Sequence, residues 1–571
     1  FKIPKASYTH CKYFLVKNDM LTYKSIRGKE IYIDEQSEFQ SITEILQSRF
    51  EQDDTWVSSL KKLHDPYLMK DMDRAILRIV EAKEKWERVM VFWDYDVDGV
   101  TSTALMMHML RTLEIEASYR IPHRIHDGYG LKSYFVDEMC ELWVDLCITV
   151  DCGSRDAEIV SYAREKWLDI IVTDHHHVPD RMPDDAIAFL NPHRPDCTYP
   201  YVFLSGAWVV FKLIQALSQK LLSPDQAEKY IRESVDITAI WTVADCMPLT
   251  WENRTIVIEW LKQIKYSRSK GIRRMIEEKI HDDLDADIFW FLIGPRLNAA
   301  GRLDSPYKAV NVILNNGKTL EGTLTEIERL NTSRKEKTKE SYEQALSEID
   351  TSHNIIIYTA DDIHHGIIGI VAGRLCEEFY KPVIVLAREE TKYVASCRSP
   401  EYISIVDILE NYKDMFLAFG WHAGAAGFSI DISQFEKFRK TLIADVDLKD
   451  FTGHNPKLEV TKILSLDEIG FNLIEEIQRY KPYGNGNPKP IFYIKDFMPD
   501  GFWFLGSKSR DHLQFKHRYG FKIFGFGMGQ YYEVLKKHIS LWNTLSLVVD
   551  ISEDNYMGKR GILVKVVDII L

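Results

Sequence analysis

Three short apolar runs in the first half of the chain each end in acidic residues. The runs VMVFWDYD (89–96), LCITVDCG (146–153) and DIIVTDHHH (169–177) pass from β-branched side chains straight into Asp or His, and polar or helical sequence follows each. Buried strands that alternate with helices predict a parallel α/β sheet, in which the carboxyl ends of the strands share one edge. A fourth apolar segment, AIWTVADCMPL (239–249), brings Asp245 to a similar position. The pattern predicts an α/β domain with an acidic edge.

This edge would gather more negative charge than a protein tolerates without compensation. The acidic and imidazole groups are Asp94, Asp96, Asp98, Asp151, Asp174, Asp245, His175 and His176. Like charges in one pocket raise one another's pKa, and a divalent cation removes that difficulty. Carboxylates with one or two imidazoles and no thiolate suit Mn²⁺ or Mg²⁺ better than Zn²⁺, and there are enough ligands for two ions. Two such ions would activate a water molecule and stabilise the leaving oxygen of a phosphodiester. The predicted chemistry is therefore metal-assisted phosphoester hydrolysis.

Neither acidic motif is specific by itself. A single Asp-x-Asp-x-Asp loop is often a calcium site or a solvated turn, and Asp-His-His alone is a weaker signal still. Their joint occurrence after successive apolar strands, followed by Asp245, is what favours a catalytic site.

Length, charge and cysteine content narrow the class of protein. A chain of 571 residues is long enough for three or four domains. No apolar run approaches the roughly 18 residues that span a bilayer, and the N-terminal FKIPKASYTH lacks the apolar segment of a secretory signal, so we expect a cytoplasmic protein. The net charge of −13 argues against coating nucleic acid by bulk electrostatics but allows a local basic groove. The 8 cysteines form no CxxC pair, which indicates reduced thiols.

The rest of the chain predicts two further domains. Residues 319–350 are highly charged, lack Pro and carry apolar residues at helical spacing, which predicts a long exposed connecting helix. The strand-like runs NIIIYTA, KPVIVLA and YVASCRS then predict a second α/β domain over 351–453. From 454 to 571, β-rich segments separated by turn residues predict a small barrel or sandwich. The first part would divide into an N-terminal extension, 1–60, and the metal-binding domain, 61–318.

Several motifs carry a family resemblance. The segments DYDVDG, VDCG, TDHHHVP and TVADCMPL, in this order, resemble the four motifs of the DHH phosphoesterases. LHDPYLMKDMDRA (63–75), IPHRIHDGYGL (121–131) and GPRLNAAGRLDS (294–305) more specifically resemble the RecJ family of single-strand exonucleases, and that resemblance covers nearly the whole chain. It implies an enzyme of DNA repair and recombination that removes 5′ mononucleotides processively from single-stranded DNA. It also implies that the β-rich region is an OB fold, a fold that commonly stacks bases on aromatic side chains.

The resemblance assigns roles to the acidic edge. It implies that Asp96, Asp98, Asp151, His175 and Asp245 are metal ligands, with Asp94 a ligand or near neighbour. Asp174 would orient the site, and His176 would face the scissile phosphate. Phe92 stands where many DHH enzymes carry a histidine, so Asp94 is expected to supply the missing contact.

The same resemblance extends to substrate binding and partners. GRLCEEFYKP, SCRSPE and GWHAGAAGF resemble the DHH-associated domain, where arginine forks would match phosphate oxygens. The implied DNA-binding residues are Arg296, Asn298, Arg302, Arg374, Ser396, Arg398 and His422. For each arginine, a surface salt bridge is the open alternative. The implied partners are single-stranded DNA, single-strand-binding protein and a RecQ-type helicase, with the chain a monomer and no membrane involved.

Tryptophan departs from the family pattern systematically. Nine of the 13 tryptophans stand where relatives usually carry glycine: Trp93, Trp143, Trp167, Trp208, Trp241, Trp251, Trp260, Trp290 and Trp421. If each indole overpacked its site by about 1–3 kcal/mol, nine would cost on the order of 9–27 kcal/mol, more than the roughly 5–15 kcal/mol that stabilises a typical fold. One hypothesis is that these positions are glycines encoded by UGA, a codon that some bacteria read as glycine and other codes read as tryptophan.

Two other functions remain open at the level of sequence. If the tryptophans are real and obstruct the site, the chain would be a non-catalytic DNA-binding or replication-scaffold protein. A DHH phosphodiesterase acting on short oligonucleotides or cyclic dinucleotides is the other alternative, which the β-rich C-terminal region and the GPRLNAAGR segment argue against.

Overall fold

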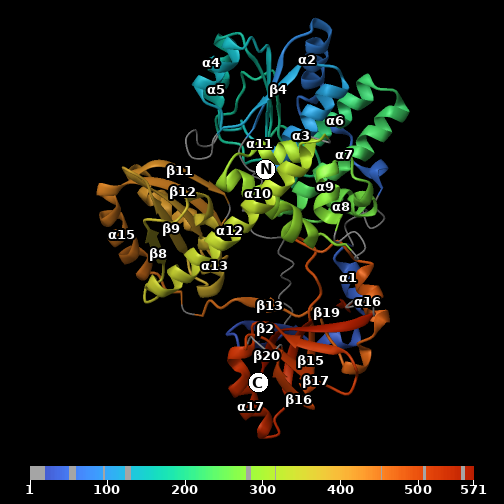
Figure 1. The fold of residues 1–571 in the computed structure, drawn as a ribbon, viewed down its shortest axis with the longest axis vertical. Coiled ribbons are helices and arrows are strands. Elements are labelled where there is room, and N and C mark those ends of the chain that lie inside the picture. The colour runs from blue at the N-terminus through green and yellow to red at the C-terminus, as the bar shows by residue number, and fades with distance from the viewer. Residues whose placement is uncertain are drawn as a thin grey trace, which may run out of the picture.

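The protein is described from a computed structural model with three domains, of which the first and the second are joined by a long helix (Figure 1). The described residues are 20–50, 59–93, 97–122, 130–277, 284–314, 317–422, 424–451, 453–505, 510–554 and 560–571, with the side chains of residues 97, 421 and 422 also left out. The three are called the first, second and C-terminal domains below.

The first domain is built on a fully parallel five-stranded sheet of order β4-β3-β5-β6-β7. Its strands are β3 (Val89–Trp93), β4 (Ala117–Arg120), β5 (Leu146–Val150), β6 (Asp169–Thr173) and β7 (Ala188–Leu190). Successive residues of a strand point to opposite faces, and here both faces are apolar. Val89 and Val91 join a core with α2 (Met72–Lys85), α3 (Val97–Thr112) and α6 (Gly206–Leu221). Met90 and Phe92 join the opposite core with α4 (Ser133–Glu141) and α5 (Ala157–Glu165). The predicted parallel α/β sheet is present, with helices on both faces.

A helical layer follows this sheet and leads to the second domain. It consists of α7 (Pro224–Ala244), α8 (Trp251–Gln263), α9 (Lys270–Ile276), α10 (Gly294–Leu303) and α11 (Tyr307–Leu314). The 29-residue helix α12 (Leu320–Glu348) then runs toward the second domain (Figure 1). It buries few of its residues, as its charged sequence indicates.

The second domain has a five-stranded sheet of order β11-β12-β10-β9-β8, in which only the β8–β9 pair is parallel. The strands are β8 (Ile356–Ala360), β9 (Val383–Arg388), β10 (Lys392–Arg398), β11 (Phe416–His422) and β12 (Ala425–Asp431). Helix α13 (Ile368–Phe379) packs on one face and α15 (Ile432–Asp447) on the other.

The C-terminal domain contains a seven-stranded sheet and takes in part of the N-terminal sequence. The sheet comprises β14 (Lys462–Ile463), β15 (Phe492–Phe497), β16 (Gly501–Phe504), β17 (Leu513–Lys516), β18 (Lys522–Gly525), β19 (Leu545–Asp554) and β20 (Gly561–Ile570), with α17 (Tyr532–Ser540) before β19. Strands β1 (Met20–Lys24) and β2 (Glu30–Asp34) form a small sheet with β13 (Lys457–Glu459). Helix α1 (Ile42–Ser48) shares a core with α16 (Phe471–Gln478). Residues 20–48 therefore pack on the far end of the chain, a pairing that no local sequence signal indicates.

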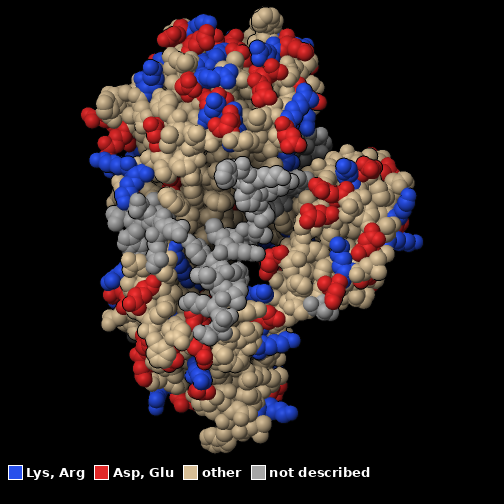
Figure 2. Space-filling model, turned by 180° about the vertical axis from the view of Figure 1, so that it is seen from behind, with Lys and Arg blue, Asp and Glu red and all other residues tan. Residues whose placement is uncertain are grey.

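Charge is mixed over the surface seen from behind. Lys and Arg are interspersed with Asp and Glu over this face (Figure 2). In the part of the chain that is described, none of the helices has both the length and the apolar character needed to cross a membrane.

Candidate metal centre

Four of the predicted acidic residues and both histidines meet at the carboxyl edge of the first sheet. Asp151 directly follows β5, and Asp174, His175 and His176 follow β6. Asp98 lies in the first turn of α3, and Asp245 caps the end of α7. The chain adopts these positions because buried parallel strands deliver the residues after their carboxyl ends to one edge of the sheet.

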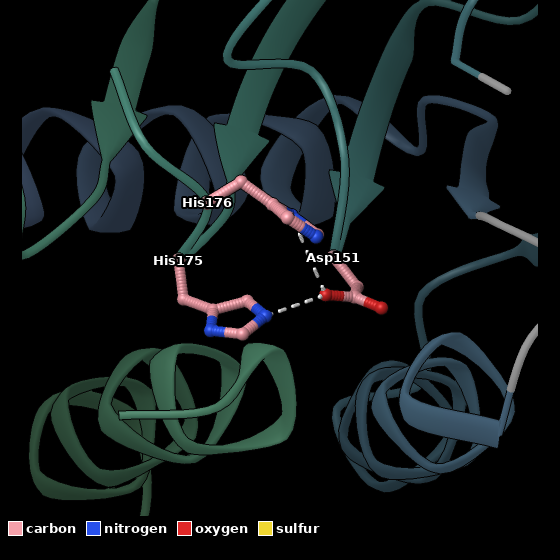
Figure 3. A group of neighbouring side chains, drawn as sticks. All are labelled: Asp151, His175 and His176. Carbon is pink, nitrogen blue, oxygen red and sulfur yellow. Dashed lines mark ion pairs between the residues drawn. The ribbon is translucent and has the colours of Figure 1, made fainter. Parts of the chain in front are cut away.

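His175 stands at the centre of the group. Its Nε2 lies 3.2 Å from Oδ1 of Asp151, 3.7 Å from Oδ2 of Asp98 and 3.8 Å from Oδ2 of Asp245. Both His175 and His176 turn their rings toward Asp151 (Figure 3). Two sets of potential ligand atoms result, each with all atoms within 4.8 Å of one another, and they share His175: Asp151, His175 and His176; and Asp98, His175 and Asp245.

The donor set fits hard divalent cations. It offers carboxylate oxygens and imidazole nitrogens without a thiolate, which suits Mn²⁺ or Mg²⁺. Asp98 and Asp151 are almost completely buried, and burying carboxylates near one another is costly without a compensating positive charge. The residues present are therefore suited to holding such ions.

The buried carboxylate of Asp98 is held by the start of α6. Its Oδ2 accepts a hydrogen bond from the N–H of Gly206 at 2.7 Å, and its Oδ1 accepts one from the N–H of Ala207 at 2.9 Å. The first N–H groups of a helix lack partners within the helix and favour negative charge. A Cβ on Gly206 would lie 2.6 Å from Oδ1 of Asp151, so glycine lets this helix end approach both carboxylates.

Asp174 organises the loop that carries the histidines. Its Oδ1 accepts from the N–H of His175 at 2.7 Å, from the N–H of His176 at 3.1 Å and from Nδ1 of His176 at 2.7 Å, while its Oδ2 accepts from the N–H of Ser154 at 3.0 Å. Burial opposes ionisation of Asp174, but the neighbouring imidazoles and these hydrogen bonds outweigh it, so the pKa of Asp174 lies well below its ordinary value. Asp174 thus orients His176 and does not itself point at the two ligand sets.

Asn191 is a supporting residue that the motifs do not reveal. Its buried Nδ2 donates to Oγ of Ser154 and to the carbonyl of His176, both at 2.9 Å, and its Oδ1 accepts from the N–H of His193 at 2.8 Å. Burial, followed by the charges of nearby histidines, lowers the pKa of His193 to about 4. The sequence offered one weak signal, a polar residue directly after the apolar strand β7.

Asp94 and Asp96 lie outside the described residues. Phe92 is completely buried, with its ring centre 5.0 Å from that of Phe135 in the core beneath α4. It therefore packs in the core and takes no part in the group around His175.

The residues expected to bind DNA fall into two groups in the described structure. Ser396 and Arg398 lie together on β10, where Nη1 of Arg398 is 3.4 Å from Oγ of Ser396. A Cβ on Gly369, in the first turn of α13, would lie 3.0 Å from that Oγ and 3.4 Å from Nη2 of Arg398. Ser396, Arg398 and the start of α13 at Gly369 therefore lie together, and this group is called the polar spot below.

The other expected residues lie at the junction of the first and second domains. Arg302, at the end of α10, donates to the carbonyl of Gly366 at 3.1 Å, and the guanidinium of Arg374 lies 5.8 Å from the ring centre of Tyr342 on α12. Asn298 is half-buried on α10. Arg296 pairs with Glu328 of α12 at 2.5 Å, which is the surface salt bridge that stands as the alternative to DNA binding. The side chain of His422, on β11, lies outside the description.

Comparison with models of protein families identifies the three domains of the chain. The model of the DHH family, N-terminal domain, matches residues 88–240, the DHHA1 domain matches 352–447, and the RecJ OB domain matches 461–568. The sheet with the acidic edge is thus a DHH domain, the second domain is a DHHA1 domain, and the C-terminal sheet is an OB domain. The predicted fold class is confirmed.

Similar proteins of known name show to which family of DHH proteins the chain belongs. The single-stranded-DNA-specific exonuclease RecJ of Haemophilus influenzae is 31% identical over 76% of this chain and 79% of its own length. The Bacillus subtilis RecJ is also 31% identical, over 88% of this chain, which spans 64% of that relative. The crystal structure of RecJ from Thermus thermophilus in complex with Mn²⁺ matches with a TM-score of 0.79 and 28% identity, covering 93% of this chain and 76% of that one. The chain belongs to the RecJ family.

Proposed function

We propose that the chain is a metal-dependent 5′-to-3′ exonuclease that hydrolyses single-stranded DNA to 5′ mononucleotides in repair and recombination. The observation that carries the proposal is the pair of ligand sets sharing His175 at the edge of a DHH sheet. Curated relatives are named single-stranded-DNA-specific exonucleases, and RecJ structures are described with Mn²⁺ and with Mg²⁺.

Each residue of the centre has a proposed role. The proposed ligands for two Mn²⁺ or Mg²⁺ ions are Asp94, Asp96, Asp98, Asp151, His175 and Asp245. When bound, such ions supply an activated water and stabilise charge on the leaving oxygen. The carboxylate of Asp174 accepts a hydrogen bond from Nδ1 of His176, which leaves the other side of that imidazole to face the scissile phosphate.

The second and C-terminal domains would hold the strand. The polar spot of Ser396, Arg398 and the start of α13 offers a hydroxyl, a forked guanidinium and helix N–H groups, all suited to a phosphate. Further phosphate contacts are proposed for Arg296, Asn298, Arg302, Arg374 and His422. In the C-terminal domain, the partly exposed aromatics Trp503 and Phe526 are available for stacking bases.

The same function sets the proposed surroundings of the chain. We expect a cytoplasmic monomer that meets single-strand-binding protein and a RecQ-type helicase. The proposed boundaries are 61–318 for the catalytic domain, 319–350 for the connecting helix, 351–453 for the DHHA1 domain and 454–571 for the OB domain. The proposed N-terminal extension is 1–60, of which the described residues 20–48 pack on the C-terminal domain.

The test uses single-stranded DNA labelled at either end, incubated with Mn²⁺ and the full chain. We expect mononucleotides released from the 5′ end, and loss of activity on Asp151→Asn, with Asp185→Asn as the matched surface control. Release from the 3′ end would contradict the polarity. A folded, DNA-binding but inert chain would indicate a scaffold, and preference for a dinucleotide over a long strand would indicate the small-substrate alternative.

A further inference from the structure

A loop of the C-terminal domain packs against the segment that carries Asp245. Residues 480–487, YKPYGNGN, connect α16 to β15 and are called the 480–487 loop below. In Figure 1, α16 lies beside α1, below α8 of the first domain. Hydrogen bonds of Asn485 to Cys246 and Leu249 join the loop of the OB domain to the connection between α7 and α8, which begins at Asp245.

The contact is anchored by a buried arginine. Arg254 of α8 is almost completely buried, and its guanidinium donates to three carbonyls of the loop, those of Tyr480, Lys481 and Pro482, at 2.9–3.2 Å. Asn487, also fully buried, closes the loop on itself by donating to the carbonyls of Tyr480 and Pro482. A buried guanidinium that donates to three carbonyls fixes the position of the loop, because breaking those bonds would leave a buried charge without these acceptors.

Asn485 contacts the connection next to the ligand. Its Nδ2 donates to the carbonyl of Cys246 at 2.6 Å, and its own carbonyl accepts from the N–H of Leu249 at 2.7 Å. Cys246 follows Asp245 directly and has a positive φ of 56°, a conformation that an outside hydrogen bond helps to hold. Two glycines permit this approach: a Cβ on Gly484 would lie 2.8 Å from Cδ1 of Leu249, and Gly486 has a φ of +75°.

We propose that Asn485 is a positioning residue for the metal centre: through the 480–487 loop, the OB domain sets the backbone from which Asp245 reaches the ligand set. This inference rests on the proposed function. It means that the OB domain acts on catalysis as well as on DNA, because displacement of the loop by a bound strand would move a metal ligand.

The test measures Mn²⁺ binding to the full chain by calorimetry and by the spin resonance of free Mn²⁺, without DNA. Asn485→Ala removes the donor to Cys246, and Asn485→Asp replaces it with an acceptor of the same shape. We expect both to weaken Mn²⁺ binding about tenfold, as loss of outer-shell contacts does. The matched control is Asn455→Ala, whose amide donates to Glu30 at 3.0 Å in the small sheet of β1, β2 and β13.

Nuclease assays then separate positioning from DNA binding. The Asn485 variants should lose kcat at low Mn²⁺, recover it at high Mn²⁺ and keep the KM for DNA. Wild-type Mn²⁺ affinity in Asn485→Ala would overturn the positioning role alone. An unsubstituted chain that binds no Mn²⁺ would overturn both this role and the proposed function. Should both Asn485 variants unfold, Gly484→Ala tests the same contact by pushing the loop from Leu249, and unchanged Mn²⁺ affinity there would also overturn the role.

A second inference concerns the tryptophans and rests on different observations. Among the described residues, 11 non-glycine residues have a positive φ, and five of them are Trp86, Trp143, Trp167, Trp251 and Trp542. This backbone region is strained for residues with a Cβ and is the ordinary place for glycine. One residue type among twenty therefore accounts for almost half of these strained positions.

Four of these five tryptophans occupy the position after a helix where glycine is most common. After α4, for example, the N–H of Trp143 donates to Cys140 and that of Val144 to Met139, which is the glycine-closed ending of a helix. The same pattern recurs at Trp167 after α5. These indoles contribute little packing, since the side chain of Trp143 is 77% exposed and that of Trp167 is 92% exposed. The condition on which the estimated cost of nine overpacked indoles rests therefore does not hold at Trp143 and Trp167.

Four other tryptophans are buried with an unsatisfied polar group. The indole N–H groups of the described residues Trp93, Trp208, Trp241 and Trp260 have no hydrogen-bond partner. A buried indole N–H ordinarily finds an acceptor, and one without it is costly. Both sets of tryptophans therefore lie in surroundings that disfavour tryptophan: the first has a backbone conformation typical of glycine, and the second buries an indole N–H without an acceptor.

We infer that the five tryptophans with a positive φ and the four buried ones, nine positions in all, are glycine in the protein as its own cells make it, because UGA is read as glycine there. The geometry adds Trp86 and Trp542 to the positions expected from sequence. Trp290 was expected from sequence but belongs to neither set, because its φ is not positive and its side chain is partly exposed. The side chain of Trp421 is not among those described.

Peptide mass spectrometry of the protein isolated from its source, together with the codons of its gene, tests this inference. We expect glycine in the peptides that cover the nine positions and UGA in the gene. Tryptophan in most of those peptides, or UGG at most of the codons, would overturn it.

Discussion

The metal-binding edge of the first domain and the polar spot of the second domain hold charge in different ways. At the edge, buried carboxylates are fixed by backbone N–H groups: Asp98 by the start of α6, and Asp174 by the loop after β6. In the polar spot, the half-buried Arg398 donates to partners close by in the chain, Ser396 and the carbonyl of Cys397. The proposed metal centre is therefore held in place before an ion arrives, whereas the guanidinium proposed to bind phosphate rests on hydrogen bonds within its own strand.

The largest expected effect comes from changing a proposed metal ligand at the carboxyl edge of the first sheet. Asp151→Asn keeps the shape but removes the charge that faces both histidines, so nuclease activity should fall by at least about 100-fold, more than loss of an outer contact costs. Activity is measured on end-labelled single-stranded DNA across Mn²⁺ concentrations. Activity within about threefold of the unsubstituted chain would show that Asp151 is not a ligand.

Much of this edge is predictable from sequence, because a strand followed at once by Asp or His fixes where that side chain emerges. Asp151, Asp174 and His175 obey this rule. The residues that the sequence misses depend on contacts between distant segments: Asn191 reaches Ser154 across 37 residues, and Asn485 reaches Cys246 across 239. A surface salt bridge is the alternative that the sequence leaves open for Arg296, but its partner Glu328, 32 residues further along, is not identifiable from sequence for the same reason.

Asp236 shows what happens to a buried carboxylate with fewer donors than Asp174 has. It accepts from the N–H of Arg268 at 2.9 Å, and burial raises its pKa from 3.8 to about 6. The folded state therefore binds more protons than the unfolded state between about pH 4 and pH 6, and stability falls as the pH rises through this window.

Removing that titration should stabilise the protein at neutral pH. Asp236→Asn keeps an oxygen for Arg268, so we expect about 1–3 kcal/mol more stability at about pH 7 and little difference at about pH 4. Denaturant unfolding at both pH values measures this. An equal change at the two values would show that the carboxyl is not protonated preferentially in the folded state.

A smaller effect is expected from the polar spot. Arg398→Lys keeps the positive charge but loses the fork, so the KM for single-stranded DNA should rise about tenfold while kcat changes little. Arg388→Lys, at a surface ion pair with Asp361, is the matched control. A fall in kcat without a change in KM would mean that Arg398 acts on the reaction and not on strand binding.

The smallest expected effects are changes in stability when exposed tryptophans are replaced by glycine, and they distinguish backbone strain from side-chain packing. Trp143→Gly and Trp167→Gly relieve a positive φ and lose almost no buried area, so each should stabilise the fold by about 1 kcal/mol. Trp503→Gly on strand β16, where φ is not positive, is the control and should destabilise, since glycine weakens a strand. Thermal unfolding of the three variants ranks them directly. If Trp503→Gly also stabilised the fold, removal of an exposed apolar ring would explain the gain at all three positions. If only Trp143→Gly and Trp167→Gly stabilised it, the gain would come from the backbone, which has the conformation of glycine at those two helix ends.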